Sequence, residues 1–296
     1  MKVSFYRCCI IFLLCAVSSF MYGNTLTARN DTLTHTNLEF CRSRNNEAMI
    51  CYNNGDYTKA VECWYELLDF NYPPAITNLG IAYMNGAGVD RNHKRAYDFF
   101  CKAAEMNEAT AFFHLGTMYK LGIYVEQNDS VAFCCYNSSA KQGNTAAMNV
   151  LGKFYQSGTY VVKDNLAARK WLRLSALNDD VEGLYLYGVL LATVFPDYVD
   201  QELGSALNCI YRAARMGHRE SQILLIDDAL QNEGYHQAYR WAKVLYNNGD
   251  NVGTKLLADC YRYGYGVRRN RKRARELYRQ AADAGNDEAR KILEKW

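Results

Sequence analysis

Residues 75–104 read AITNLGIAYMNGAGVDRNHKRAYDFFCKAA and contain two stretches of helical spacing separated by glycines. Before the GAG segment, Ala75, Leu79 and Tyr83 recur every four residues, which places them on one face of a helix. After it, Ala96 and the residues that follow restore a pattern of small and aromatic side chains. Because glycine readily adopts the left-handed backbone that ends a helix, this stretch predicts two helices joined by a glycine turn.

The same pattern recurs along the chain. Leu79, Leu115 and Leu151 are each followed by glycine and are 36 residues apart, and Tyr187 continues the series. After a longer fourth unit and a shorter fifth unit, the pattern returns around Leu257. A constant period of about 20–50 residues is typical of stacked repeats, so the sequence predicts an array of helical hairpins.

These residues resemble the Sel-one-like repeat family, a relative of the tetratricopeptide repeats. The clearest copies of the family pattern are residues 75–104 and 255–285, and residues 111–143 and 147–176 are good copies. The resemblance covers roughly residues 45–296. It implies an all-α fold, an α/α superhelical solenoid of about six stacked helical hairpins, completed by a C-terminal capping helix.

Two kinds of departure from the repeat pattern are visible. From Ala192 to Gly204 a longer sequence replaces the glycine turn, which predicts a structured loop that protrudes from the stack. The units around Gly55 and Gly234 have shorter turns, nearer to the tetratricopeptide form. We therefore expect the curvature of the stack to change at those two units.

The first residues have the order of a signal peptide. Two basic residues precede an apolar run at 8–17, which small residues follow. The run is shorter than the roughly 20 residues that a transmembrane helix needs. We therefore predict a signal peptide at 1–23, cleaved near Ser19 or Gly23, and a linker at 24–44. Export to the periplasm or out of the cell follows, with an uncleaved signal anchor as the alternative.

Eight of the eleven cysteines lie outside the predicted signal peptide, an even number that is compatible with disulfides in an exported protein. The repeat register instead places five of them at apolar packing positions, namely Cys51, Cys63, Cys135, Cys209 and Cys260. Cys101 and Cys134 fall at polar positions, so we expect both to face solvent, where a disulfide between them is an open alternative. Cys41 has no assignable partner.

The sequence carries no signature of catalysis or of cofactor binding. It lacks the C-x-x-C, H-E-x-x-H, G-x-S-x-G and G-x-x-x-x-G-K motifs. Adjacent acids such as Asp227 and Asp228 diverge by about 100° on a helix and are typical of solvated faces. We therefore predict no cofactor, no metal site and no enzymatic activity.

Two surfaces are candidate sites for a partner. Stacked hairpins leave a concave groove lined mainly by the first helix of each hairpin, which is the usual partner site in solenoids. Once core positions are removed, the groove positions mix amides, hydroxyls and aromatics: Asn78, Ile81, Asn85, His114, Thr117, Lys153, Ser157, Val189, Arg262 and Tyr263.

The second candidate is a basic patch that consists of Arg268, Arg269, Arg271, Lys272, Arg273 and Arg275. Its local positive field would attract an acidic protein, anionic lipid headgroups or surface polysaccharide. The net charge of +3 is too small to indicate a nucleic-acid partner for the chain as a whole, so none is predicted.

These features favour an exported, monomeric scaffold or adaptor that binds a protein partner in its groove. The family resemblance places similar proteins in envelope signalling, host interaction and the neutralisation of secreted toxins. An immunity or inhibitor protein that uses the 192–204 loop as a wedge is therefore the first alternative. A hydrolytic enzyme is the second.

Overall fold

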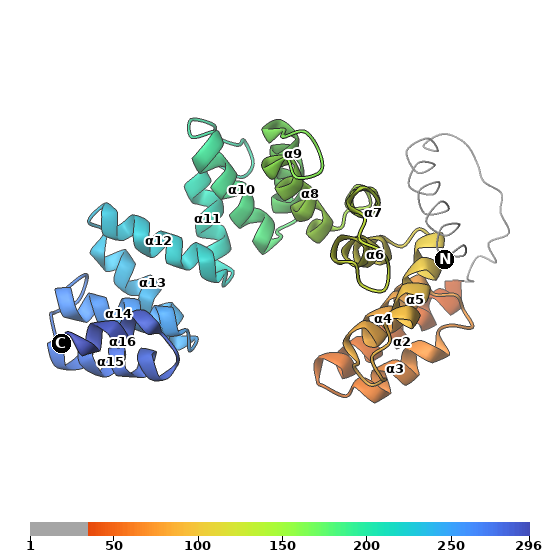
Figure 1. Ribbon diagram of the computed structural model, residues 1–296, viewed down its shortest axis with the longest axis horizontal. Coiled ribbons are helices and arrows are strands. Elements are labelled where there is room, and N and C mark those ends of the chain that lie inside the picture. Colours follow the sequence, from red (N-terminus) through yellow and green to blue (C-terminus); the bar gives the residue numbers. More distant parts are fainter. Residues whose placement is uncertain (1–34) are drawn as a thin grey trace. The chain divides into compact units, whose positions relative to one another are not determined.

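The computed structural model describes residues 35–296, and each regular element within that range is an α-helix (Figure 1). An isolated β-bridge joins Asp200 and Gly204, and no strand is present among the described residues. The all-α prediction is therefore confirmed. The predicted signal peptide at 1–23, and the predicted linker as far as residue 34, lie outside the described residues.

The chain divides into two compact units, one ending at Trp171 and one from Leu172 to Trp296, which we call unit 1 and unit 2. The helices of unit 1 are α2 (His35–Asn53), α3 (Tyr57–Glu66), α4 (Pro73–Asn85), α5 (His93–Glu105), α6 (Ala109–Leu121), α7 (Asp129–Lys141) and α8 (Thr145–Ser157). The boundary falls inside α9 (Asn165–Leu177). The helices of unit 2 are α10 (Val181–Val194), α11 (Ala206–Arg215), α12 (Arg219–Gln231), α13 (Tyr235–Asn247), α14 (Asn251–Tyr263), α15 (Arg271–Asp283) and α16 (Asp287–Glu294).

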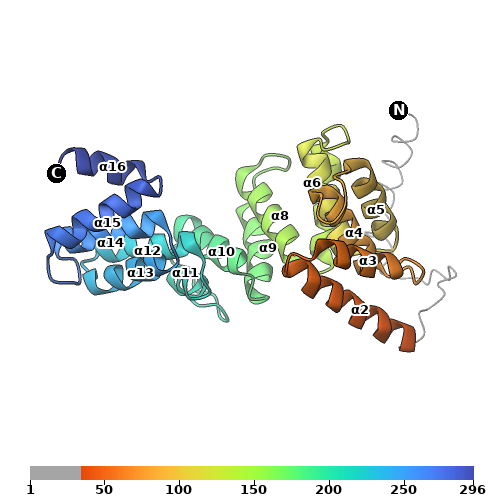
Figure 2. The ribbon, with the colours of Figure 1, turned by 90° about the horizontal axis from the view of Figure 1, so that it is seen from below.

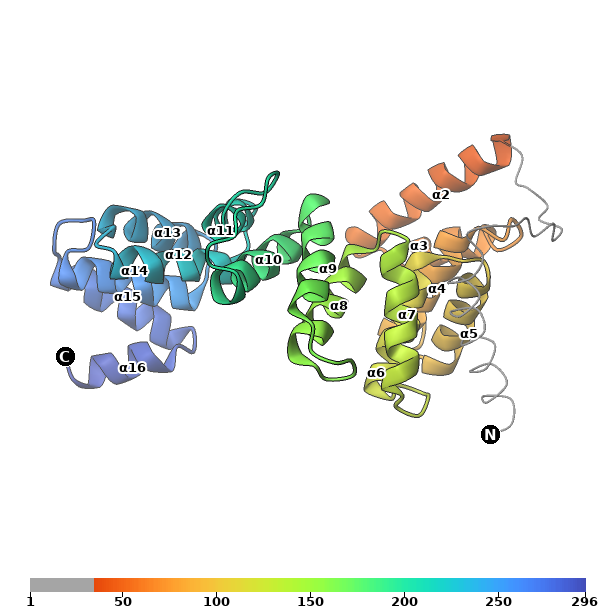
Figure 3. The same ribbon diagram turned by 90° about the horizontal axis from the view of Figure 1, so that it is seen from above.

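Within each unit, consecutive helices pack against one another as hairpins. The even-numbered helices are the first members of the pairs, and the odd-numbered helices are the second members. Figure 2 shows such a pair, α2 and α3, in unit 1, and Figure 3 shows α14 and α15 in unit 2. Helix α16 packs against α15, begins after the Asn286 cap and is the predicted C-terminal capping helix.

Two kinds of glycine explain the hairpin. Gly86 follows α4 in the left-handed conformation, with φ 71°, and its N–H donates to the carbonyl of Ala82. Gly80 follows the buried Leu79 and lies against the second helix, where a Cβ would be 2.5 Å from the Phe100 ring. The first glycine therefore ends a helix, and the second lets two helix axes approach closely.

The core of each unit follows the repeat positions. Leu79, Leu115 and Leu151 in unit 1, and Tyr187 in unit 2, are fully buried. Of the five cysteines assigned to packing positions, four are buried and Cys51 is half-buried. No disulfide forms among residues 35–296. Cysteine therefore serves in these repeats as a small core hydrophobe, as predicted.

Cys101 is buried, with 7% of its surface exposed, so the prediction that it faces solvent is wrong. The equivalent residues, Asn137 and Arg173, are half-buried, because longer polar side chains reach solvent from this position. A thiol on the same backbone position is too short to pass its neighbours. Cys134, the other cysteine expected to face solvent, is half-buried.

Helix α2 begins at His35, inside the stretch 24–44 that the sequence assigned to a linker. Cys41 and Ala48 of this helix are buried in the core of unit 1 together with Trp64 of α3. Helical packing therefore starts before residue 45. None of the helices in the described range combines the length and the apolar composition that a bilayer-spanning helix requires.

Candidate protein-binding surfaces

A buried carboxylate organises the α10–α11 loop, which replaces the glycine turn of the other repeats. The side chain of Asp200 has no exposed surface. Its carboxylate accepts hydrogen bonds from Arg173 Nε at 2.6 Å and from the Tyr187 hydroxyl at 2.8 Å. It also accepts the backbone N–H groups of Glu202 and Leu203, at 3.0 and 3.1 Å. Donors from α9, from α10 and from the loop itself therefore hold the loop in one conformation.

The electrostatics of this network explain why Asp200 is charged inside the protein. Burial raises the pKa of the Asp200 carboxyl, but the hydrogen bonds from Arg173, Tyr187 and the loop backbone outweigh burial and hold that pKa well below its ordinary value. Burial and the bond to Asp200 raise the pKa of the Tyr187 hydroxyl. The carboxylate is thus ionised and surrounded by donors of its own chain, which suits a structural role.

The same loop presents apolar side chains to solvent. Val199 is 65% exposed and Tyr198 is 37% exposed, next to the exposed Pro196. Leu203, by contrast, is buried, and its carbonyl accepts a hydrogen bond from Cys209 Sγ at 3.7 Å. A loop that is anchored at its centre and apolar at its tip is a candidate contact for another protein, because little ordering is left to occur on binding.

The sequence predicted this loop but gave no indication of the role of Asp200. Arg173 and Tyr187 lie 27 and 13 residues before Asp200 in the sequence. In the repeat register, Arg173 is at a polar position and Tyr187 is at the core leucine position, so neither position indicates a contact with Asp200. A usable signal was Tyr187 itself, which stands where the earlier repeats have leucine. A buried tyrosine hydroxyl needs a hydrogen-bond partner, so the exchange indicated a polar group nearby.

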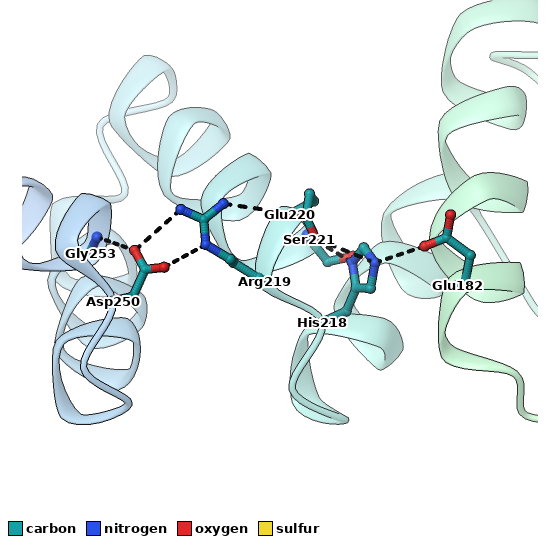
Figure 4. Close-up of polar contacts among 7 residues, drawn as sticks. All are labelled: Glu182, His218, Arg219, Glu220, Ser221, Asp250 and Gly253. Carbon is teal, nitrogen blue, oxygen red and sulfur yellow. Dashed lines mark hydrogen bonds and ion pairs between the residues drawn. The ribbon is translucent and has the colours of Figure 1, made fainter. Parts of the chain in front are cut away.

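A chain of polar contacts joins the starts of the first helices in unit 2 (Figure 4). His218 is the N-cap of α12, where its Nδ1 accepts the Ser221 N–H at 3.2 Å. Its Nε2 therefore carries the proton and donates to Glu182 of α10 at 3.1 Å. The next residue, Arg219, donates to Asp250, which is the N-cap of α14. These contacts fix the starts of α10, α12 and α14 relative to one another.

Two of the predicted groove residues, Asn78 and Asn85, make contacts with the preceding first helix. Asn78 Nδ2 donates to Asn45 Oδ1 at 3.1 Å, and Asn85 Nδ2 donates to the Tyr52 hydroxyl at 3.5 Å. Both acceptors lie on α2. The amides of these two predicted groove residues therefore form part of a polar seam between α2 and α4.

Two further groove residues, His114 and Thr117, pack toward second helices. The His114 ring stacks on Phe100, with centroids 4.9 Å apart and planes 10° from parallel. Burial lowers the pKa of His114 to about 4, so its imidazole is neutral near pH 7. The Thr117 hydroxyl lies 3.1 Å from the hydroxyl of Tyr136. Both side chains are half-buried, which limits what they can offer a partner.

The six remaining groove residues differ in exposure. Those exposed to solvent are Lys153, Ser157 and Tyr263. Those that are half-buried are Ile81, Val189 and Arg262. The guanidinium of Arg262 lies 5.1 Å from the centroid of the Trp296 ring. Seven of the ten predicted residues belong to unit 1 and three to unit 2, and the groove as a binding site stays a prediction.

The predicted basic patch lies on α15 and on the turn before it. Its exposed members are Arg268, Arg269, Arg271, Lys272 and Arg275. Arg273 is half-buried and forms an ion pair with Glu276 at 3.1 Å. Within residues 35–296, the five exposed members have no carboxylate partner. The helix dipole disfavours cations in the first turn of a helix. A bound anionic group would both supply the missing partner for these cations and offset the unfavourable interaction with the dipole.

Within the part of the chain that the structure describes, no three His, Cys, Asp or Glu side chains are grouped so that they could hold a metal ion. The contacts above instead describe anchored loops, capped helices and charged surface.

Comparison with known proteins identifies the repeats. The model of the Sel1 repeat family matches residues 73–108, 111–144, 145–180 and 253–286, which include the four copies recognised in the sequence. No protein of curated function matches the sequence.

Solved structures share the fold. The chain is similar to a Sel1 repeat protein from Oxalobacter formigenes, at 25% identity over 80% of this chain and 96% of that one, with a TM-score of 0.64. It is also similar to a protective antigen of uropathogenic Escherichia coli strains with an SLR fold, at 22% identity over 86% of this chain and 64% of that one, with a TM-score of 0.56. The chain is a Sel1-like repeat protein.

Proposed function

We propose that this chain is an exported scaffold that binds a protein partner, with the tip of the α10–α11 loop as its principal contact. Sel1 repeats generally mediate contacts between proteins, which supports the general function. Export rests on the signal-peptide order of residues 1–23. The groove residues on the first helices, of which Lys153, Ser157 and Tyr263 are exposed, are proposed as secondary contacts.

The observation that carries the proposal is the pairing of a buried Asp200 with an exposed Val199. A loop that served only to connect two helices would need neither an internal carboxylate nor an apolar tip. The hydrogen bonds to the Asp200 carboxylate fix the backbone that follows the tip, at Glu202 and Leu203, and tie it to the side chains of Arg173 and Tyr187. Val199 and Tyr198 then offer a preformed apolar contact, whose binding costs little conformational entropy.

The same loop supports an inhibitor of a secreted effector enzyme as a second candidate. A rigid projection with an apolar tip has the properties of a wedge that enters a partner's cleft. An inhibitor would bind one partner tightly, whereas an adaptor would bind several partners with moderate affinity. No comparable feature supports a hydrolase, because the ionised Asp200 is buried and held by donors of its own chain.

Photo-crosslinking from the loop tip tests the proposal. A photoreactive amino acid is placed at Val199 of the tagged chain, and as a control at Val162, an exposed valine in the turn before α9. Irradiation in extracts of the producing cells is expected to give a cross-linked partner from position 199. A single stoichiometric partner favours the inhibitor, and several favour the adaptor. Equal labelling from positions 162 and 199, or none from 199, would overturn the loop as the contact.

Export is tested separately by the N-terminal sequence of the chain recovered from the periplasm or medium. It is expected to begin shortly after Ser19 or Gly23. A chain that keeps Met1 and stays with the cytoplasmic fraction would contradict export.

A further inference from the structure

The second helices of unit 2 are strongly and selectively basic. Helices α11 and α13 contain cations and no acidic residue, and α15 adds five cations and two acids. The cations of the three helices are Arg212, Arg215, Arg240, Lys243, Arg271, Lys272, Arg273, Arg275 and Arg279. The first helices α10, α12 and α14 carry five acids against three cations: Glu182, Glu220, Asp227, Asp228 and Asp259 against Arg219, Lys255 and Arg262. Positive charge is thus concentrated on one member of each hairpin.

Most of these cations are available to a partner. Arg212 pairs with Asp179 at 2.7 Å, and Arg273 pairs with Glu276. Within the described residues, the other seven have no carboxylate partner: Arg215, Arg240, Lys243, Arg271, Lys272, Arg275 and Arg279. All seven are exposed. Opposite charges supplied by another molecule would meet little competition from this chain.

A cleft of about 210 Å³ lies between α11 and α13, within this basic surface. It is lined by Tyr211 and Arg215 of α11 and by Gln237, Arg240, Trp241 and Val244 of α13. The Tyr211 and Trp241 rings form its apolar wall, with centroids 5.7 Å apart and planes at 82°. Arg215 and Arg240 provide two of the unpaired cations at the same place.

The apolar surface continues from the cleft along α11. Leu207 and Tyr211 are one helical turn apart and are 51% and 46% exposed. Arg215 follows one turn later, at the end of the helix. The exposed face of α11 therefore presents two large apolar side chains and then a cation, in line with the cleft. Such a stripe is costly to leave in water and is typical of a contact with another chain.

Unit 1 contains a cleft at the equivalent repeat positions, and its chemistry differs. That cleft, of about 390 Å³, is lined by Tyr65, Arg95, Asp98, Phe99 and Lys102. In the repeat register Tyr65 corresponds to Tyr211 and Phe99 to Trp241, whereas Asp98 stands in the place of Arg240. Arg95 donates to the Tyr83 hydroxyl at 2.8 Å and lies over the Tyr83 ring. The two clefts share an aromatic pair, and they differ in that unit 2 has Arg240 where unit 1 has the carboxylate of Asp98.

We propose that the second-helix face of unit 2 binds an acidic segment of a partner protein, and that one apolar side chain of that segment enters the cleft between α11 and α13. This inference rests on the proposed function and names the class of partner. The unpaired cations select acidic residues, and the cleft selects an aliphatic or aromatic anchor. The edge-to-face rings of Tyr211 and Trp241 enclose a slot and offer no parallel platform for stacked bases, which favours protein over nucleic acid.

The test uses a fluorescein-labelled peptide of Asp and Glu residues around one central leucine, with fluorescence anisotropy as the readout. The wild-type chain is expected to bind it, and raised salt is expected to weaken binding. The double substitution Arg215→Glu with Arg240→Glu is expected to weaken binding by roughly tenfold or more. Alanine in place of the central leucine is expected to weaken binding by roughly tenfold, because the anchor is lost.

The matched control reverses two exposed charges on second helices of unit 1, Lys59→Glu with Lys141→Glu, and is expected to leave binding unchanged. The inference would be overturned if the control variant lost as much affinity for the peptide as the Arg215/Arg240 variant, or if replacing the central leucine left the affinity unchanged. It would also be overturned if the chain bound an oligothymidylate more tightly than the peptide. Absence of peptide binding would overturn it as well. Cross-linking from Val199 separates the two proposals: if it persists while the peptide fails, the proposed function stands without this surface, and if both fail, neither stands.

Discussion

The second helices of the two units share a register and differ in charge. In unit 1, α3, α5 and α7 carry five cations and five acids, whereas α11, α13 and α15 of unit 2 carry nine cations and two acids. Both sets place an aromatic pair at the same repeat positions and form a cleft there. Repetition therefore specifies the packing, while exposed positions diverge freely. In a repeat protein, the exposed positions at which equivalent repeats carry different residues are therefore the ones that indicate function.

The largest loss of stability is expected from Asp200→Ala, which removes the buried carboxylate of the α10–α11 loop. The hairpins that the structure describes in unit 1 have no such loop. The substitution leaves the Tyr187 hydroxyl without its acceptor and Arg173 with only Glu202 at 3.4 Å, and it should lower the free energy of unfolding of unit 2 by about 3 to 5 kcal/mol. Amide hydrogen exchange in α10 and α11 measures that loss. Unchanged exchange in unit 2, with α4 and α6 as the internal reference, would show that the network does not hold the loop.

Acid should destabilise unit 2 through the same group. The folded pKa of Asp200 is lowered, so its stabilising contribution is fully present above the unfolded value near 4 and is lost as the pH falls below it. The protection of amides in α10 and α11, relative to their intrinsic exchange rate at each pH, is expected to fall on acidification below about pH 4. The Asp200→Asn variant keeps an acceptor without the charge and should lose this part of the pH dependence. An identical acid response in that variant would contradict the assignment.

Core leucines should be equally important in both units, because the packing is shared. Leu115→Ala in unit 1 and Leu257→Ala in unit 2 remove side chains that are 0% and 4% exposed, and each is expected to cost about 2 to 5 kcal/mol of its unit's stability. Leu207→Ala, at an exposed site on α11, should cost less than about 0.5 kcal/mol. Thermal unfolding of the three variants gives the comparison. A large loss of stability in Leu207→Ala, or a small loss in either core variant, would contradict the claim that the two units share the same core packing.

Transplanting the unit 2 residues into unit 1 sharpens the comparison. Asp98→Arg with Lys102→Val gives the cleft between α3 and α5 the residues that Arg240 and Val244 supply in unit 2. This variant is expected to bind a second equivalent of the acidic peptide, within roughly tenfold of the affinity of the natural cleft. Titration calorimetry gives the stoichiometry. A value that stays at one would mean that the aromatic pair and two substitutions are insufficient.

The smallest effect is expected at the helix cap. His218→Ala removes the acceptor for the Ser221 N–H and should cost about 0.5 to 2 kcal/mol, measured by thermal unfolding. His218→Asn copies the cap that Asn144 provides for α8 in unit 1 and should recover most of that loss. If the asparagine variant is no more stable than the alanine variant, the contact with Glu182 of α10 outweighs the cap.

The hairpins and the core leucines could be predicted because they repeat. Periodic positions such as Leu79 and Gly80 report the same packing several times, so chance agreement is excluded. Features that occur once could not be found in this way. The burial of Cys101 depends on side-chain length within one repeat, and the partners of Asp200 lie on α9 and α10.

The cleft between α11 and α13 was also not predicted from the sequence, although a comparison of equivalent repeat positions indicates it. Groove residues were predicted on first helices, where the usual partner site lies, and the basic patch was the one partner site predicted on a second helix. Comparing Tyr211 with its equivalents Cys101, Asn137 and Arg173 would have shown an exposed aromatic where other repeats have small or polar residues. The basic patch was recognised on α15, but its continuation through Arg215 and Arg240 requires the paired helices to be seen together.

The most direct test of binding through unit 2 is hydrogen–deuterium exchange of the full chain, with and without the partner that cross-links to Val199. Contact through unit 2 predicts protection of the α10–α11 loop and of α11 and α13, with α3 and α5 unchanged. Protection of α3 and α5, with the α10–α11 loop unaffected, would contradict it.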